Sequence, residues 1–354
     1  MTRPGLPSFD TAPQHGPRPL PLFLDMLRSE TAASPERRAA ALAGLRAFQA
    51  APRRAAWAPP AALHREDRAS LRDYGGDGAP VVVVPSLINP PFVLDLGARS
   101  LLRWLAGRGH RVLLVDWGAP SPDERDLDVA GHVERLLLPL LARLDAPPIL
   151  AGYCLGGTMA LAAACAMPVA GLAMIAAPWR FAGFSPRARR DIASLWQSAE
   201  PACAALGLVP MEVLQTGFWR LDPGRTIAKY ERFARLDPDG EAARSFVELE
   251  DWANAGAPLP YAAGVEIFDF IAHDVPGSGQ WRVAGKAVDP AALACPAVDF
   301  VSLTDRIVPA ASAADLPDRR DLSAGHVGMI VGSRARAQLW EPLDAWLTGV
   351  RNPD

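Results

Sequence analysis

The residues best suited to chemistry lie in the stretch Gly-Tyr-Cys-Leu-Gly-Gly at residues 152–157, where Cys154 stands two residues from both Gly152 and Gly156. When such a stretch joins a buried strand to a helix, its central residue sits on a tight turn and its side chain projects above the sheet. The glycines leave room for nearby backbone, and Gly157 adds to that room. The pattern therefore predicts that Cys154 is a nucleophile. The alternative is a glycine-rich turn that holds an inert, buried cysteine.

A cysteine nucleophile needs a base, and the base needs an acidic group that orients it. On scaffolds of this kind the order along the chain is nucleophile, acid, histidine. Asp305 follows the apolar run Val298–Ser302, and His326 stands in the small-residue loop Ser323–Gly328. Because loops after parallel strands meet at one edge of a sheet, we expect Cys154, Asp305 and His326 to form a catalytic triad there.

The other histidines are weaker candidates for the base. His273, in the sequence Ala-His-Asp of a segment expected to cover the site, is the best rival. The remaining ones stand in the Pro-rich start, at the far end of predicted strands or on a predicted helix; they are His15, His64, His110 and His132.

Acyl transfer also needs N–H donors for the oxyanion that forms on the substrate. The backbone N–H of Leu155 is one expected donor, because it opens the helix after the nucleophile. The second is expected from the loop Pro85–Pro90, where Leu87 and Ile88 are both candidates and the sequence does not decide between them. The loop that contains Trp117 is expected to be anchored by that side chain and to take no part in catalysis.

The elements that must position these residues follow from the hydrophobic pattern. Short apolar runs rich in β-branched residues predict strands that are buried on both faces. Their alternation with helical patterns predicts a parallel sheet with right-handed crossovers. The expected strands are Val81–Val84, Arg111–Val115, Pro148–Ala151 and Val169–Ile175, and the expected helices cover residues 95–108, 129–144 and a stretch from Thr158.

This alternation stops near Pro178 and returns at the strand Pro296–Ser302 and the closing helix Ala335–Leu347. The segment between them has helical patterns and no convincing strand before about Arg282. The fold class expected is therefore α/β, an α/β-hydrolase fold with a mostly parallel, doubly wound sheet and a helical cap insertion.

The chain is expected to divide at changes in composition. We expect a disordered, Pro-rich start over residues 1–20 and an N-terminal helical segment over 21–65, with Ser34 capping its second helix. The first part of the core is expected over 66–180, the cap over 181–290 and the second part of the core over 291–354. The apolar residues Leu20–Leu27 are expected to pack on the core, and contact with a partner is the alternative.

Composition excludes some functions. The formal net charge of −3 argues against nucleic-acid binding. The four cysteines have no metal-ligand spacing, so no metal is expected. No signal peptide and no apolar run long enough to span a membrane is visible, which predicts a cytoplasmic protein with reduced cysteines. The three cysteines not assigned to chemistry are expected to be small buried residues; they are Cys165, Cys203 and Cys295.

Several motifs together resemble the polyhydroxyalkanoate synthases, especially the short class III catalytic subunit. They are GYCLGG, LINPPFVLDL, VDWGAP, LTDRIVP and GHVGMIVGSRA, and the likeness runs from about residue 80 to 348. The resemblance implies polymerisation of (R)-3-hydroxyacyl groups from coenzyme A thioesters, with Cys154 carrying the chain, His326 as base and Asp305 as supporting acid. One departure is Arg306, where family members usually have histidine.

The resemblance also implies an acyl-coenzyme A substrate, a polyester product and no cofactor. A second synthase subunit, a homo-oligomer and a location at the polyester granule surface are expected on the same basis. Two alternatives remain: a cysteine-type α/β-hydrolase (esterase, thioesterase or intracellular polyester depolymerase), or a non-catalytic granule-associated homologue.

Overall fold

The computed structural model describes residues 16–53 and 57–351. Most of the start that was expected to be disordered, residues 1–15, lies outside the described residues. The chain forms two compact units: one comprises Met1–Ala55 and Pro223–Asn254, and the other comprises Ala56–Asp222 and Ala255–Asp354. We call them the helical unit and the sheet unit.

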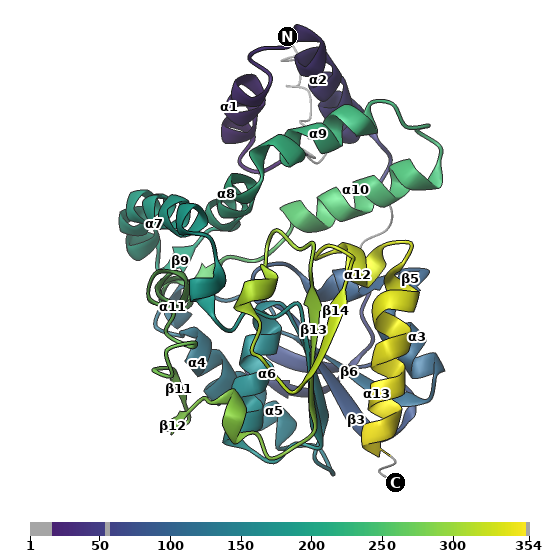
Figure 1. Cartoon of the computed structure of the whole chain (residues 1–354), viewed down its shortest axis with the longest axis vertical. Coiled ribbons are helices and arrows are strands. Elements are labelled where there is room, and N and C mark those ends of the chain that lie inside the picture. Colours follow the sequence, from purple (N-terminus) through teal and green to yellow (C-terminus); the bar gives the residue numbers. More distant parts are fainter. Residues whose placement is uncertain (1–15, 54–56, 352–354) are drawn as a thin grey trace, which may run out of the picture. The chain divides into compact units, whose positions relative to one another are not determined.

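The sheet unit is built on an eight-stranded sheet with the order β1-β2-β6-β3-β7-β8-β13-β14 (Figure 1). The pairings from β6 through β14 are parallel, whereas β1, β2 and β6 pair antiparallel. The expectation of a mostly parallel sheet is confirmed. The strands are β1 (Ala62–Glu66), β2 (Ala69–Asp73), β3 (Asp77–Val84), β6 (His110–Asp116), β7 (Ile149–Tyr153), β8 (Gly171–Ile175), β13 (Ala297–Ser302) and β14 (Asp318–Leu322).

The central strands are apolar along their whole length because both faces of the sheet are covered. Val82 and Val84 of β3 belong to a buried cluster that includes Met159 of helix α6 (Leu155–Ala166). Val81 and Val83 are equally buried and, by the alternation of side chains along a strand, point to the opposite face. The sheet is therefore doubly wound, as the continuous apolar runs predicted.

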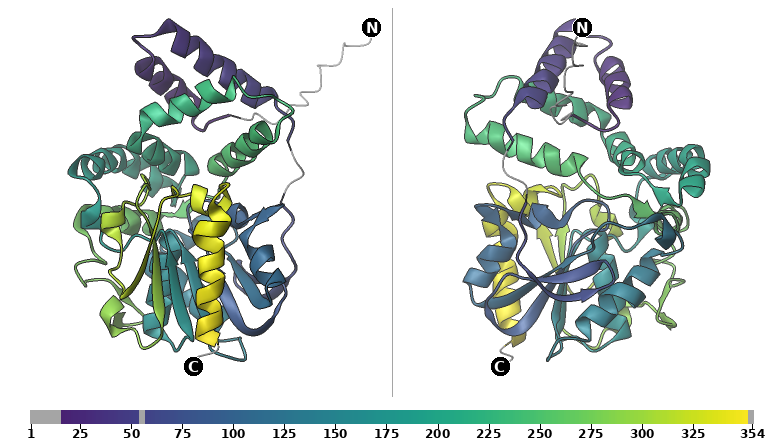
Figure 2. Two further views of the ribbon diagram at one scale, coloured as in Figure 1. Left: turned by 45° about the vertical axis from the view of Figure 1, so that its right-hand side comes forward. Right: turned by 180° about the vertical axis from the view of Figure 1, so that it is seen from behind.

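Two groups of helices provide this cover. On β7 and β8 lies α6, which also contacts the turn of π-helix over His132–Leu137. On β6 lies α3 (Leu101–Gly107), and its Trp104 contacts Trp340, the residue directly before the C-terminal helix, with ring centroids 5.6 Å apart. That helix, α13 (Glu341–Arg351), runs along the sheet in yellow in Figure 2.

Two predicted helices are shorter or less regular than expected. The helix expected over 95–108 begins only at Leu101, because Pro91–Leu94 forms a 3-10 turn and the small hairpin β4 (Asp95–Leu96) and β5 (Arg99–Ser100) follows it. The helix expected over 129–144 is divided into α4 (Val129–Gly131), the π-helical turn and α5 (Leu138–Leu141). Pro139, which lacks an N–H group, stands in α5.

Part of the predicted cap belongs to the sheet unit. Its helices α7 (Pro186–Leu206), α8 (Met211–Leu221) and α11 (Tyr261–His273) pack together, with α7 contacting the other two. Two-residue strands also occur where none was expected: β9 (Leu208–Val209) pairs with β10 (Leu259–Pro260). A hairpin of β11 (Arg282–Val283) and β12 (Lys286–Ala287) lies near the position predicted.

The helical unit joins the N-terminal helices α1 (Leu20–Glu30) and α2 (Pro35–Ala50) to α9 (Pro223–Phe233) and α10 (Glu241–Asn254). The predicted cap is therefore divided between the two units. Tyr230 is fully buried at the centre of the helical unit, with its ring edge-on to Phe23 and its hydroxyl donating to Glu250 at 2.8 Å. A Cβ on Gly44 would lie within 3.0 Å of the Tyr230 backbone, so glycine allows α2 to approach α9 closely.

The predicted apolar start is partly buried within this unit. Phe23 and Leu27 are buried, whereas Leu22 and Leu24 are 49% and 39% exposed. The Ser34 side chain accepts a hydrogen bond from the backbone N–H of Arg37, which confirms the predicted helix cap.

Candidate active site

Cys154 occupies the turn between β7 and α6, as the sequence predicted. Its backbone has φ +57° and ψ −133°, a region that residues other than glycine rarely adopt. Strain of this kind costs on the order of 1–3 kcal/mol and persists where the surrounding structure enforces it. The Cys154 N–H donates to the carbonyl of Ile175 at 2.9 Å, and its carbonyl accepts from Gly157 at 2.8 Å. These bonds hold the turn from both sides.

The flanking glycines are required by close packing of the backbone. A Cβ on Gly152 would lie within 3.0 Å of the Gly157 Cα. A Cβ on Gly156 would lie equally close to the carbonyl oxygen of Val84, at the end of β3. Gly152 therefore lets the end of β7 approach the first turn of α6, and Gly156 lets the end of β3 approach the same turn, which is where an oxyanion site must form.

Asp305 and His326 meet at the carboxyl end of the sheet. The Nδ1 atom of His326 lies 2.6 Å from Oδ2 of Asp305, and both side chains are buried. The other carboxylate oxygen, Oδ1, accepts hydrogen bonds from the backbone N–H groups of Ile307 at 2.7 Å and Val308 at 3.1 Å. The loop after β13 thus fixes the carboxylate, and the carboxylate orients the imidazole.

Hydroxyl groups at the end of β13 hold the loop that carries His326. Ser302 Oγ donates to the carbonyl of Ala324 at 2.5 Å, and Thr304 Oγ1 donates to the carbonyl of Ser323 at 3.1 Å. These two supports were not predicted from the sequence. Hydroxyl residues next to a predicted strand end, in Val-Ser-Leu-Thr-Asp, were the available signal.

The electrostatics of the site favour a charged imidazole. Burial alone would lower the pKa of His326, but the charges of Asp305 and Cys154 and hydrogen bonds to both side chains raise this pKa to about 10. A raised histidine pKa means that the positive form is stabilised when its neighbours are negative. The structure therefore brings Cys154, Asp305 and His326 together; their catalytic roles remain predictions.

The candidate oxyanion donors lie on the two segments that meet at the turn. Leu155 is the first residue of α6, where N–H groups have no partner within the helix. In the loop after β3, the Ile88 N–H donates to Ser86 Oγ at 3.2 Å, and no such bond is present for the Leu87 N–H among the described residues. This difference favours Leu87 of the two candidates for the second donor, and the role of each stays a prediction.

Trp117 anchors its own loop, which follows β6, to the loop after β3. Its side chain is 5% exposed and its Nε1–H donates to the carbonyl of Pro85 at 3.0 Å. The interpretation of Trp117 as a loop anchor is confirmed.

Tyr153, directly before the nucleophile, was not singled out from the sequence. Its ring stacks on the imidazole of His326 with centroids 5.0 Å apart and planes 28° apart. Its hydroxyl donates to the backbone carbonyl of the same histidine at 3.2 Å. Both parts of one side chain therefore contact His326.

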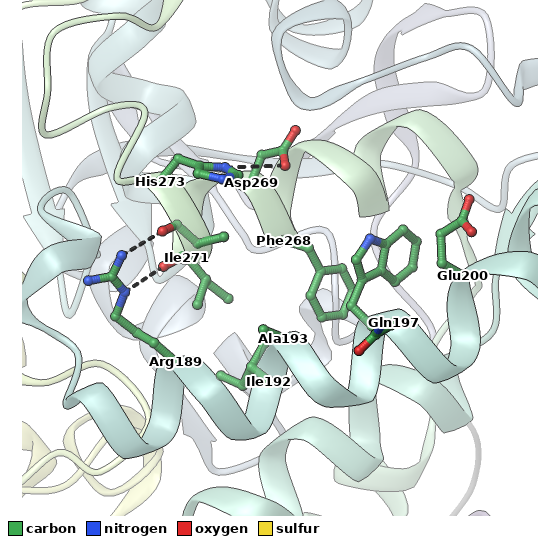
Figure 3. Close-up of a pocket in the computed structure, with 11 residues that line it drawn as sticks. Arg189, Ile192, Ala193, Gln197, Glu200, Phe268, Asp269, Ile271 and His273 are labelled. Atoms are coloured by element: carbon green, nitrogen blue, oxygen red, sulfur yellow. Dashed lines mark hydrogen bonds and ion pairs between the residues drawn. The ribbon is translucent and has the colours of Figure 1, made fainter.

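The rival histidines have other surroundings. His273 is an exposed residue at the end of α11, and its Nδ1 lies 3.6 Å from Oδ1 of Asp269. Both side chains line a cavity of about 340 Å³ between α7 and α11 (Figure 3). Neither Cys154 nor Asp305 lines that cavity. The ring of His132 is buried and bonded to the Asp128 carbonyl at 2.6 Å, and burial lowers its pKa to about 4. Residue 15 lies outside the described residues.

Arg306, which follows Asp305, turns its side chain to a different partner. Its guanidinium forms an ion pair of 2.6 Å with Asp222 at the end of α8, and the side chain is 65% exposed. The positive charge at this position is thus neutralised by a neighbour from the cap.

The remaining cysteines differ in burial. Cys203 is buried as expected, but Cys165 and Cys295 are only partly buried, which corrects that prediction. Within residues 16–53 and 57–351, no cluster of His, Cys, Asp and Glu is arranged to hold a metal ion. Over the same residues, no helix has the length and apolar character needed to cross a membrane.

A family model described as "Alpha/beta hydrolase family" matches residues 81–339. Proteins named poly(3-hydroxyalkanoate) polymerase subunit PhaC are similar in sequence. The one from Haloarcula marismortui is 27% identical over 81% of this chain and 67% of its own length, and the one from Haloferax mediterranei is 28% identical over 81% and 63%. The one from Allochromatium vinosum is 26% identical over 82% of this chain and 88% of its own. The chain thus spans about two thirds of the haloarchaeal proteins.

Among solved structures, a thermophilic esterase from Thermogutta terrifontis superposes with a TM-score of 0.51 at 19% identity, covering 80% of this chain and 94% of that one. This likeness supports the fold. The family model and the named relatives confirm the resemblance inferred from the motifs.

Proposed function

Because the chain belongs to the alpha/beta hydrolase family, we propose that it is a polyhydroxyalkanoate synthase-like acyltransferase that uses Cys154 as its nucleophile. One observation carries this proposal: a cysteine occupies the strained turn at the start of α6, within reach of an imidazole that Asp305 orients. The polymerase names of the sequence relatives point to the same reaction class.

In the first proposed step, His326 takes the proton of the Cys154 thiol, and the thiolate attacks the carbonyl carbon of a 3-hydroxyacyl-coenzyme A. A new C–S bond forms to Cys154, the C–S bond to coenzyme A breaks, and the departing coenzyme A thiolate takes the proton from the imidazolium. The N–H groups of Leu155 and of Leu87 or Ile88 stabilise the oxyanion between these events.

In the second proposed step, the hydroxyl of another 3-hydroxyacyl-coenzyme A gives its proton to His326 and attacks the acyl group on Cys154. An ester C–O bond forms, the C–S bond to Cys154 breaks, and the Cys154 thiolate recovers the proton from the imidazolium. The product is an acyl-coenzyme A that is longer by one unit and can acylate Cys154 again.

A cysteine suits this cycle better than a serine would. Transfer from coenzyme A to Cys154 exchanges one thioester for another, so the acyl group stays activated. A serine ester would be a more stable intermediate and a poorer acyl donor to the next hydroxyl. The thiol also ionises more easily, which lets an imidazole generate the nucleophile at neutral pH.

We propose that the reaction needs no cofactor beyond the coenzyme A thioester substrate. We also propose that the protein acts in the cytoplasm at the surface of polyester granules, as a homo-oligomer that works with a second synthase subunit. These proposals follow from the synthase class and not from a particular contact.

The test is to incubate the purified protein with (R)-3-hydroxybutyryl-coenzyme A and to measure free coenzyme A, free 3-hydroxybutyrate and insoluble polyester together. The proposal expects coenzyme A release matched by ester bonds in polymer, and loss of both in Cys154→Ala. Cys203→Ala is the matched control, because it removes a buried thiol of α7.

Free acid without polymer would instead identify a thioesterase or another hydrolase, in which water replaces the hydroxyl of the monomer. Equal activity of Cys154→Ala and the wild-type protein would contradict the proposed nucleophile and favour a non-catalytic role for this site.

A further inference from the structure

Tyr153 contacts the proposed base through two separate groups. It is the last residue of β7, its side chain is 3% exposed, and its ring stacks on the His326 imidazole at 5.0 Å between centroids. The hydroxyl donates to the His326 backbone carbonyl at 3.2 Å. The side chain therefore restrains the plane of the imidazole and the position of the loop that bears it.

Tyr153 directly precedes Cys154 in the chain, so its contact with His326 also affects the geometry between the thiol and the imidazole. The nucleophile and the residue that touches the base are neighbours on one rigid strand end, with the Cys154 N–H bonded to the Ile175 carbonyl of the adjacent strand. His326 comes from a loop 172 residues later in the chain. Tyr153 thus ties the position of the imidazole to the strand that carries the thiol.

Orientation matters because the two ring nitrogens have different partners. Nδ1 of His326 lies 2.6 Å from Asp305, and Cys154 is the other group whose charge acts on the ring. An imidazole can serve both partners only in a narrow range of ring rotations, and a stacked phenol ring resists rotation out of that plane. Fixing reacting groups in this way is a large source of rate enhancement in enzymes.

The electrostatic environment favours the same arrangement. The groups facing the phenol are the imidazole of His326, the carboxylate of Asp305 and the sulfur of Cys154. Burial, followed by the negative charges of Cys154 and Asp305, raises the pKa of Tyr153 well above its usual value, so the phenol stays neutral and its hydroxyl stays a donor. The face of a neutral phenol attracts a positive imidazolium.

We propose that Tyr153 is a positioning residue for His326: its ring holds the imidazole in line with Cys154 and Asp305, and its hydroxyl fixes the loop that carries the imidazole. The inference rests on the proposed function only in taking Cys154 and His326 as a reacting pair. Its test needs no acyl-coenzyme A, so its failure is distinguishable from a failure of the acyltransferase proposal.

The measurement is the rate of Cys154 alkylation by iodoacetamide between pH 5 and pH 10, followed by mass spectrometry of the peptide that contains Cys154. Tyr153→Leu removes both the ring and the hydroxyl, and we expect alkylation at pH 7 to slow by about 10-fold, with the half-maximal pH rising by about one unit. Tyr153→Phe keeps the ring and loses one buried hydrogen bond, and we expect a smaller slowing of about 3-fold.

The decisive comparison uses a His326→Ala background. A residue that acts through the imidazole has nothing left to act on there, so Tyr153→Leu should change the alkylation profile of His326→Ala by less than about 2-fold. Tyr230→Phe is the matched control, because it removes the hydroxyl of a buried tyrosine in the helical unit and should leave Cys154 alkylation unchanged.

Two results would overturn the inference. One is a folded Tyr153→Leu protein with the wild-type alkylation profile; the other is an equal slowing by Tyr153→Leu with and without His326. If Tyr153→Leu does not fold, Tyr153→Phe and Tyr153→Ile are compared instead; wild-type alkylation at every pH in Tyr153→Phe would overturn the role of the hydroxyl, and equal alkylation in the two variants would overturn the role of the ring.

Discussion

His326 and Asp305 are joined by a buried contact of 2.6 Å between Nδ1 and Oδ2, while Oδ1 of the same carboxylate accepts two backbone N–H groups. The carboxylate is therefore fixed before it orients the imidazole. This arrangement leaves the other ring nitrogen for proton exchange with Cys154, which is the geometry that the proposed reaction needs.

Asp305→Asn should lower the rate of acyl transfer by about 10²–10⁴-fold, because the amide holds the imidazole in the wrong tautomer and does not stabilise the imidazolium. The measurement is the initial rate of coenzyme A release. Asp344→Asn is the matched control, since Asp344 forms a comparable contact of 2.7 Å with His110 and takes no part in the proposed site. Equal losses in the two variants would contradict the role assigned to Asp305.

The contribution of His326 to the free energy of unfolding should disappear at alkaline pH. The folded-state pKa of this histidine is raised to about 10 from an ordinary value of 6.5, so the stabilisation is fully present below about pH 6.5 and is lost as pH rises through 10. Urea unfolding of the wild-type protein and of His326→Gln at pH 7 and pH 10.5 measures this. The stability difference between the two proteins should shrink at pH 10.5; a constant difference would contradict the raised pKa.

Glu266 should produce a trend of the same sign nearer neutral pH, with stability falling as pH rises. Burial and the neighbouring Asp128 raise its pKa to about 7, and its carboxylate accepts from the N–H groups of Val129 at 2.6 Å and Ala130 at 3.1 Å. The folded protein then binds more protons than the unfolded chain between about pH 4.5 and 7, so stability falls as pH rises through this window.

Replacement Glu266→Gln should remove this component, and the denaturant midpoint should change less between pH 5 and pH 8 than in the wild-type protein. An unchanged pH slope in the variant would show that other groups cause the trend.

The turn around Cys154 should not tolerate a side chain at Gly156. A Cβ there would lie within 3.0 Å of the Val84 carbonyl and of Pro85, both backbone groups of a buried strand end. We expect Gly156→Ala to destabilise the protein by about 3 kcal/mol or more, since the backbone must move. In Gly349→Ala the Cβ meets nothing within 4 Å and lies in α13, so this control should stabilise by about 0.5–1 kcal/mol. Chemical denaturation compares the two.

The sequence predicted the central strands because β3, β6, β7 and β8 are continuous apolar runs, which a sheet covered on both faces requires. It missed β1, β2 and β14 for the converse reason, since none of them is a continuous apolar run. In β14, Asp-Arg-Arg-Asp-Leu, partly buried and exposed positions alternate before the buried Leu322, and four of the five side chains are charged, as suits an edge strand. No apolar run marks such a strand.

Part of the candidate site was also predictable from the sequence. Cys154, Asp305 and His326 follow a fixed order and stand at strand ends, so local patterns found them. The stacking of Tyr153 on His326 joins residues far apart in the chain and leaves no local signal. The grouping of α9 and α10 with the N-terminal helices depends similarly on the burial of Tyr230 against Phe23, which the helical periodicity of each segment does not reveal.

The central claim is that Cys154 becomes covalently acylated, and mass spectrometry of the protein quenched within one turnover with (R)-3-hydroxybutyryl-coenzyme A tests it most directly. The account predicts a hydroxybutyryl group on the peptide that contains Cys154, absent from the Cys154→Ala protein and discharged by added hydroxylamine. Consumption of the thioester with the acyl group on another residue, or with no acyl-enzyme at any time point, would contradict it.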